Sequence, residues 1–223
     1  MSSPSTAVLI GATGLVGGAL LTQLLDDARF GKVVSLGRRP SGKSSPKLEE
    51  HTINFDDLKS WQPLVKGDVA FSALGTTIAQ AKTKEAQWKI DHDYQLWFAQ
   101  AAKQNGVPTY VLCSASSANS SASVFYSRMK GKLDDAVQAL GFDHTRIMRP
   151  SLLVGDRTRE KPRTGEKVGS VMLGIANAVG LFRRYKEIPG ATVAKAMLNS
   201  SFDPAPGAKI YNLDEVFTEA ARG

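Results

Sequence analysis

A tyrosine and a lysine, Tyr126 and Lys130, have the types and the spacing that carbonyl–alcohol redox chemistry requires. Four residues apart on a helix, they project from one face with about 5–6 Å between their Cβ atoms. The pKa of a free tyrosine is about 10, and a neighbouring ammonium group lowers it. We predict that Tyr126 gives a proton to a carbonyl oxygen as hydride arrives, or removes one in reverse. Lys130 assists it and holds the nicotinamide ribose.

A hydroxyl donor that fixes the substrate oxygen is the third group such a site needs. Ser114 follows an apolar run that is predicted to be a strand. Ligands of open parallel sheets bind at the carboxyl ends of the strands, which is where Ser114 falls. Ser116 and Ser117 follow in the same serine-rich segment. The sequence favours Ser114, with Ser116 second, and leaves the choice between them open.

Three glycines near the N-terminus indicate a dinucleotide site. They follow the predicted strand 7–10 and open a predicted helix. At such a turn the first glycine permits a tight bend, the second lets the backbone approach a pyrophosphate, and the third allows close packing of helix on strand. The helix N-terminus favours the anion. The predicted cofactor residues of this turn are Gly11, Thr13, Gly14, Leu15, Val16 and Gly17.

The residues after the second predicted strand, 32–36, indicate which dinucleotide is preferred. An acidic residue at this point binds the ribose 2′-hydroxyl of NAD, whereas an arginine accommodates the 2′-phosphate of NADP. The chain has Arg38 and Arg39 there. We therefore predict that both arginines bind the cofactor and that the cofactor is NADP(H).

Strands and helices alternate along the chain, which predicts an α/β fold with a doubly wound parallel sheet, the Rossmann architecture. We expect one domain over residues 1–223, with residues 155–205 as a small C-terminal cap that faces the substrate. The predicted strands span 7–10, 32–36, 50–54, 68–74, 109–113, 144–148 and 210–213. The predicted helices span 15–26, 84–105, 125–140, 168–182 and 192–199.

Composition bounds the partners and the setting. A single cysteine, Cys113, excludes an intramolecular disulfide, and without a recognisable targeting signal it predicts a cytoplasmic protein. The net charge of +7 suits an anionic cofactor, and no nucleic-acid motif accompanies the basic segment 157–167, so we expect no nucleic-acid partner. We expect no metal site and no integral membrane segment. The apolar helix 168–182 is too short to span a bilayer and suits a contact in a homodimer.

The chain resembles the atypical short-chain dehydrogenase/reductase family, which is NAD-dependent epimerase/dehydratase-like. Within it, the chain resembles the branch of the human Tat-interacting-protein oxidoreductase and its fungal mitochondrial relatives. The resemblance runs through nearly the whole chain in the family's order. The matching stretches are GATGLVG at 11–17, LGRR at 36–39, ALGTT at 73–77, DHDY at 91–94, YSRMKG at 126–131, RPSLLVGDR at 149–157 and AKAML at 194–198.

The resemblance implies further cofactor residues. It places Asp56 near the adenine and Arg157 near the mouth of the site. The residues that it implies along the rest of the cofactor are Leu74, Gly75 and Thr76 after the fourth predicted strand, and Pro150 and Ser151 beside the nicotinamide.

These observations lead to two hypotheses of different classes. The first is an NADPH-dependent oxidoreductase that transfers hydride to a small-molecule carbonyl substrate, with Ser114, Tyr126 and Lys130 as catalytic residues. The second is an NADPH-binding sensor or regulatory module without turnover. The presence of both Tyr126 and Lys130 favours the enzyme.

Overall fold

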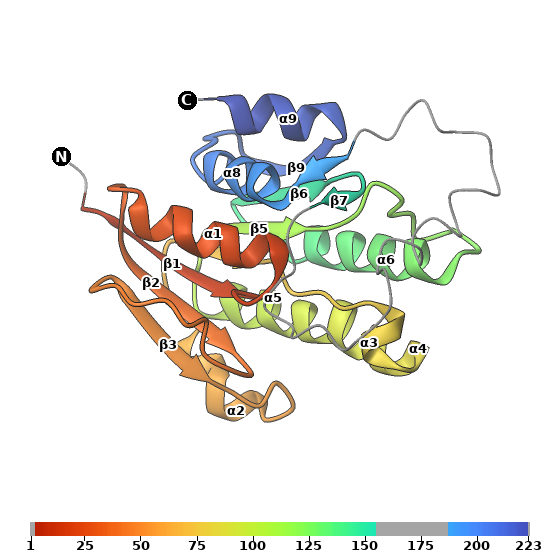
Figure 1. The fold of residues 1–223 in the computed structure, drawn as a ribbon, viewed down its shortest axis with the longest axis horizontal. Helices are drawn as coiled ribbons and strands as arrows, with labels where there is room; N and C mark the ends of the chain where they lie inside the picture. The colour runs from red at the N-terminus through yellow and green to blue at the C-terminus, as the bar shows by residue number, and fades with distance from the viewer. Residues whose placement is uncertain (1–2, 155–186, 223) are drawn as a thin grey trace, which may run out of the picture.

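The computed structural model describes residues 3–154 and 187–222. Its centre is a seven-stranded sheet in which every neighbouring pair of strands is parallel, in the order β3-β2-β1-β4-β5-β6-β9 (Figure 1). This confirms the predicted doubly wound α/β fold. The strands are β1 (Ser5–Ile10), β2 (Phe30–Gly37), β3 (Leu48–Thr52), β4 (Val69–Ser72), β5 (Thr109–Cys113), β6 (His144–Arg149) and β9 (Gly207–Asn212).

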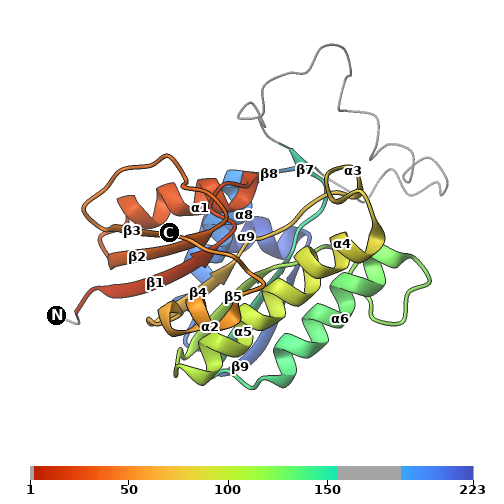
Figure 2. The ribbon, with the colours of Figure 1, turned by 90° about the horizontal axis from the view of Figure 1, so that it is seen from below.

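Helices cover both faces of the sheet, so the central strands are buried on both sides. In β1, Ala7 and Leu9 pack into one apolar core while Val8 and Ile10 pack into the other. The first core lies under α1 (Leu15–Asp26), α8 (Gly190–Ser200) and α9 (Asp214–Ala221). The second lies under α2 (Leu58–Trp61), α5 (Tyr94–Gln104) and α6 (Phe125–Ala139), as Figures 1 and 2 show.

The predicted helix 84–105 is divided in the structure. It consists of α4 (Lys84–Trp88), a π-helical turn η2 (Lys89–Asp93) and α5, and is preceded by the short helix α3 (Ile78–Ala81). A π-turn carries an extra residue, which disturbs the regular ladder of backbone hydrogen bonds. The side-chain amide of Gln95 donates to the Asp91 carbonyl at 2.7 Å. The sequence predicted the helix but not this turn.

The predicted cap region contributes to the body of the domain. Residues 155–186, which include the predicted helix 168–182 and the basic segment 157–167, lie outside the described residues. The short parallel strands β7 (Leu153–Val154) and β8 (Ile188–Pro189) flank them. From Gly190 the chain forms α8, which packs beside α1 in the same helix layer.

The carboxyl ends of β1 and β4 meet where the strand order reverses, which is the usual ligand crevice of such sheets. Close contacts fix this point. A Cβ atom on Gly11, which has a φ of +91°, would lie 2.4 Å from the Ala73 carbonyl carbon. A Cβ atom on Gly17 would lie 2.1 Å from the Gly11 oxygen. Helix α1 therefore begins directly against the turn that follows β1.

Gly17→Ala is expected to destabilise the protein because the new methyl group would overlap the Gly11 carbonyl. We expect a loss of about 3 kcal/mol in the free energy of unfolding, or about 6–12 °C in Tm. Gly14→Ala is the matched control, since its Cβ would first meet an atom at 3.4 Å and its φ of −85° suits alanine. Thermal denaturation of both variants measures the difference, and equal Tm values would contradict the packing argument.

Candidate active site

The turn after β1 has the features of a pyrophosphate site. The Gly14 N–H donates to the Gly11 carbonyl at 2.9 Å and so closes the turn. Gly14 is the N-cap of α1, and no acidic residue lies in the first turn of this helix. The nearest atom to a Cβ at Gly14 is 3.4 Å away, so the protein's own packing tolerates a side chain there. Because Gly14 has no side chain, the N-terminus of α1 is open to an anion. The phosphates of a dinucleotide fit such a site.

Arg38 and Arg39 lie directly after β2, and both are exposed. Within residues 3–154 and 187–222, neither arginine forms an ion pair with an acidic side chain. Their guanidinium groups are therefore available to a phosphate, to which arginine binds in a bidentate manner.

Asp56, which the resemblance places near the adenine, is part of a small network. Its carboxylate accepts a hydrogen bond from the Tyr94 hydroxyl at 3.0 Å and pairs with Lys89 at 2.8 Å. Lys89 holds the pKa of Asp56 below its usual value. The Tyr94 ring stacks on Phe55 with centroids 5.0 Å apart. Sequence analysis missed Lys89 and Tyr94, which link the loop after β3 to the helices after β4.

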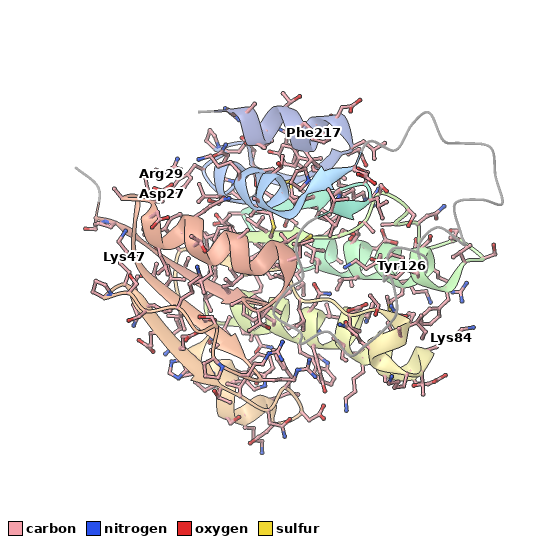
Figure 3. The ribbon with its side chains drawn as sticks, viewed as in Figure 1. Asp27, Arg29, Lys47, Lys84, Tyr126 and Phe217 are labelled. Atoms are coloured by element: carbon pink, nitrogen blue, oxygen red, sulfur yellow. The ribbon has the colours of Figure 1, made fainter. Side chains whose placement is uncertain are left out.

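Tyr126 and Lys130 lie one turn apart near the start of α6, as predicted from their spacing. Tyr126 is labelled in Figure 3. Tyr126 is 37% exposed, whereas Lys130 is only 4% exposed. The Lys130 ammonium group donates to the Cys113 carbonyl at 3.2 Å. Because Cys113 ends β5, this bond holds the lysine beside Ser114, the next residue.

The pKa of Tyr126 differs from our expectation. Although the residue as a whole is 37% exposed, its hydroxyl group is buried, and this burial raises the pKa above 10. The charge of Asp91 raises the pKa further, as do Cys113 and Asp134. These effects oppose the lowering of the pKa that we expected from Lys130. A raised pKa keeps the phenol protonated at neutral pH, which is the form that gives a proton to a carbonyl oxygen.

The Ser114 hydroxyl is bound to a carboxylate that sequence analysis missed. It donates to Asp134 Oδ1 at 2.6 Å, and Asp134 Oδ2 accepts from Arg149 Nε at 2.9 Å. Asp134 is fully buried, and burial raises its pKa against the opposing effect of these two donors and of Lys130. With its proton directed to Asp134, Ser114 is oriented to accept a further hydrogen bond, whereas we expected it to donate one to the substrate oxygen. The available sequence signal was that Asp134 lies four residues after Lys130.

The remaining predicted cofactor residues follow the carboxyl ends of neighbouring strands. Leu74, Gly75 and Thr76 follow β4, and the Thr76 N–H donates to Asp91 at 2.6 Å. Pro150 and Ser151 follow β6, where the Pro150 carbonyl accepts a hydrogen bond from the Ser116 N–H at 3.0 Å. Arg157 lies outside the described residues. The fold thus brings the predicted residues to one edge of the sheet.

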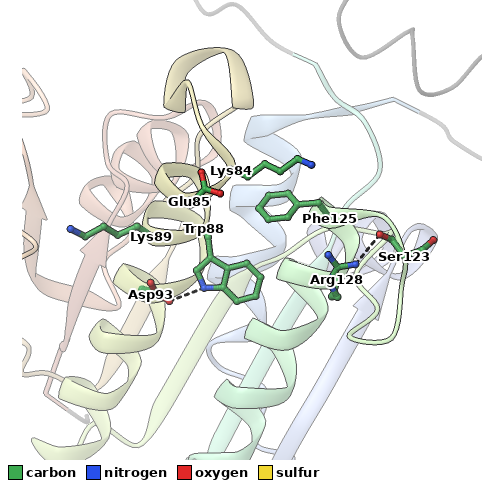
Figure 4. A pocket seen from close by; sticks show the side chains of 8 residues that line it. All are labelled: Lys84, Glu85, Trp88, Lys89, Asp93, Ser123, Phe125 and Arg128. Carbon is green, nitrogen blue, oxygen red and sulfur yellow. Dashed lines mark hydrogen bonds between the residues drawn. The ribbon is translucent and has the colours of Figure 1, made fainter.

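A groove of about 700 Å³ lies beside this edge, between α4 and the start of α6 (Figure 4). The rings of Trp88 and Phe125 lie 6.1 Å apart within it. Trp88 donates to Asp93 at 3.0 Å, and Arg128 donates to the Ser123 carbonyl at 2.8 Å. None of the residues predicted to bind the cofactor or to react lines this groove.

No cluster of three or more histidine, cysteine, aspartate or glutamate residues in the described ranges has an arrangement that could hold a metal ion. No helix in residues 3–154 and 187–222 combines the length and apolar character needed to cross a bilayer.

Comparison with known proteins relates the chain to a family of redox proteins. A family model described as NAD(P)H-binding matches residues 11–204. The mitochondrial protein fmp52-1 of Aspergillus terreus is 35% identical over 211 residues, which cover 91% of this chain and 90% of the relative. Mitochondrial FMP52 of Eremothecium gossypii is 39% identical over 170 residues, or 75% of each chain.

Solved structures of sugar-nucleotide enzymes share the fold. MoeE5 in complex with UDP-glucose and NAD has a TM-score of 0.68 at 16% identity, over 97% of this chain and 81% of MoeE5. The ADP-L-glycero-D-manno-heptose-6-epimerase of Helicobacter pylori has a TM-score of 0.69 at 18% identity, over 94% of this chain and 76% of the epimerase.

The relatives correct the expected location. The prediction of a cytoplasmic protein is wrong, because the similar curated proteins are named as mitochondrial. A lone cysteine excludes an intramolecular disulfide, but it does not distinguish one reducing compartment from another.

Ser114→Ala is expected to cost about 1–2 kcal/mol of stability, because it removes a donor from the buried carboxylate of Asp134. Ser116→Ala is the matched control. The hydrogen bond that holds Ser116 comes from its backbone N–H, so we expect a change within about 0.5 kcal/mol. Urea denaturation of both variants measures the two effects. Equal midpoints would show that the Ser114–Asp134 bond contributes nothing.

Proposed function

The chain belongs to the NAD(P)H-binding, short-chain dehydrogenase-like family that includes the Fmp52 proteins, and we propose that it is an NADPH-dependent reductase of carbonyl compounds. The observation that carries this proposal is the position of Tyr126 and Lys130 at the same sheet edge as the open glycine turn. A buried lysine tied to the end of β5 places an ammonium group beside the strand ends where the cofactor would bind.

The cofactor would be held along the carboxyl ends of the strands. The turn at Gly11 to Gly17 would bind the pyrophosphate, and Arg38 and Arg39 would bind a 2′-phosphate. When bound, NADPH supplies the hydride. The chain's own contribution would be to orient the nicotinamide ribose through Lys130.

Tyr126 would give the proton that the reduced carbonyl oxygen needs. Its raised pKa favours the protonated phenol in the resting protein. Ser114 is oriented as a hydrogen-bond acceptor by Asp134, so it would receive a donor, such as the hydroxyl of the alcohol product, rather than compete with Tyr126 for the carbonyl oxygen.

Tyr126→Phe is expected to lower kcat by about 10²–10⁴-fold, because it removes the proton donor and keeps the ring. The Kd for NADPH should stay within about twofold, since the phenol is not assigned to cofactor binding. Stopped-flow absorbance of NADPH oxidation with an accepted carbonyl substrate measures the rate, and fluorescence titration measures the Kd.

Tyr211→Phe is the control for Tyr126→Phe, because Tyr211 lies on β9 and its hydroxyl group donates a hydrogen bond to Asp203 at 2.9 Å. Neither Tyr211 nor Asp203 is among the predicted site residues. Its kcat should match that of the wild type. Unchanged turnover in Tyr126→Phe would refute the assigned mechanism.

Replacement of Arg38 and Arg39 together by alanine is expected to weaken NADPH binding at least tenfold, because two charge-assisted contacts to the 2′-phosphate are lost. Binding of NADH, which lacks that phosphate, should change by less than about twofold. Calorimetric titration with both cofactors measures the ratio. Arg29→Ala, which removes a surface arginine paired with Asp27, should leave both affinities unchanged. Equal losses for NADPH and NADH would contradict the assignment.

A sensor that binds NADPH without turnover is the alternative function. The observation that favours it is that the Ser114 proton and the Lys130 ammonium group are both directed to groups of the protein. Tight NADPH binding without oxidation across a panel of aldehydes, ketones and quinones would assign this role. Oxidation of NADPH on any of them would assign the reductase.

A further inference from the structure

We propose that Asp91 is a positioning residue of this site, whose ionised carboxylate fixes the Gly75–Thr76 segment. This inference adds a residue to the proposed reductase site and so rests on the proposed function. Asp91 is 2% exposed, and a carboxylate is rarely buried unless it is paired or hydrogen-bonded.

The hydrogen bonds of Asp91 join the π-turn to the loop that follows β4. Its Oδ1 atom accepts from the Thr76 N–H at 2.6 Å, and its Oδ2 atom accepts from Gln87 at 3.4 Å. A Cβ atom at Gly75 would lie 3.7 Å from the same Oδ1. A bond from a backbone N–H to a charged oxygen is about twice as strong as one between neutral groups. Asp91 therefore fixes the conformation of the Gly75–Thr76 segment at the edge of the sheet.

The π-turn is itself anchored to the sheet. The Asp91 carbonyl accepts from Gln95 Nε2, whose Oε1 accepts from the Ser72 hydroxyl at 2.8 Å. The Gln95 carbonyl accepts from the Tyr110 hydroxyl on β5 at 3.2 Å. Because Ser72 ends β4, one chain of bonds runs from the sheet through α5 and back to the loop after β4. These hydrogen bonds hold the π-turn, and with it the Asp91 carboxylate, in a fixed position relative to the sheet.

The charge around Asp91 also connects it to the catalytic pair. The Lys130 ammonium group stabilises the ionised form of Asp91, and ionised Asp91 in turn raises the pKa of Tyr126. Other titratable residues on the adjoining elements are Asp134 on α6, Cys113 at the end of β5 and, on the π-turn itself, Lys89, His92 and Asp93.

Burial has a measurable consequence for Asp91. It raises the pKa of this carboxyl group from 3.8 to about 6, against the opposing effects of Lys130 and of the Thr76 N–H. Asp91 therefore becomes protonated as the pH falls through about 6, and the charged bond to the loop is lost there. We therefore expect the conformation of the Gly75–Thr76 segment, and the affinity of the protein for the cofactor, to change as Asp91 titrates.

The first test uses the cofactor-free protein and does not depend on turnover. We expect the Thr76 amide proton, followed by NMR, to shift with a midpoint near pH 6 and to lose this titration in Asp91→Asn. Asp93→Asn is the matched control on the same turn, and its Thr76 amide should titrate as in the wild type. A Thr76 resonance that is flat from pH 5 to 8 in the wild type would overturn the proposal.

The second test compares NADP⁺ affinities by calorimetry in the wild type, Asp91→Asn and Asp93→Asn between pH 5 and 8. At pH 8 we expect Asp91→Asn to bind about fivefold more weakly, because a charged bond becomes a neutral one. The ratio of the Kd of Asp91→Asn to the Kd of the wild type should fall to about one at pH 5, where Asp91 is protonated. The ratio cancels titration of the 2′-phosphate, whose pKa is also near 6.

The two tests separate this inference from the proposed function. If the Kd ratio of Asp91→Asn to wild type changes with pH as expected but no carbonyl compound is reduced, the reductase is refuted and the positioning role of Asp91 is supported. A pH-independent ratio, or a ratio of one at pH 8, would overturn the role of Asp91 and leave the reductase intact. A folding defect in Asp91→Asn would appear as loss of dispersed NMR signals, and Asp91→Glu, which restores the charge, should then recover the pH-dependent Thr76 signal.

Discussion

The candidate site depends on a buried positive charge, the ammonium group of Lys130. A buried ammonium group is unfavourable unless opposite charges and hydrogen-bond acceptors surround it. The Cys113 carbonyl accepts its hydrogen bond, and the carboxylates of Asp91 and Asp134 both interact with its charge. Asp134 pairs in turn with Arg149 at the end of β6. Elements from β4 to β6 are therefore connected through one lysine.

The glycine turn explains how the carboxyl ends of β1 and β4 can lie so close together. The sheet order brings β1 beside β4, and the missing Cβ atoms of Gly11 and Gly17 let the turn and α1 approach the backbone after β4. A side chain at either glycine would separate these elements. Hydrophobic packing on both faces supplies the rigidity, while the glycines and buried charges determine which groups meet at the edge.

The sequence predicted the features that depend on local spacing. The parallel sheet follows from short apolar runs that alternate with helical patterns, and the position of Tyr126 beside Lys130 follows from the helix repeat. It did not predict the partners of Ser114 and Thr76, which are 20 and 15 residues away in the chain. These contacts depend on how neighbouring crossovers stack. No local pattern encodes them, and the π-turn that aims Asp91 is likewise invisible in the periodicity.

The acidity of Tyr126 shows why composition of a motif is insufficient to assign its chemistry. A tyrosine one helical turn from a lysine was expected to lose its proton more easily. In the structure the lysine is turned toward β5, and burial together with Asp91 and Asp134 disfavours the phenolate. A phenol whose pKa is raised stays protonated at neutral pH, and it is a weaker acid than a free tyrosine. The Tyr-x-x-x-Lys spacing alone therefore does not determine the acidity of the tyrosine, because the acidic groups around it also shift its pKa.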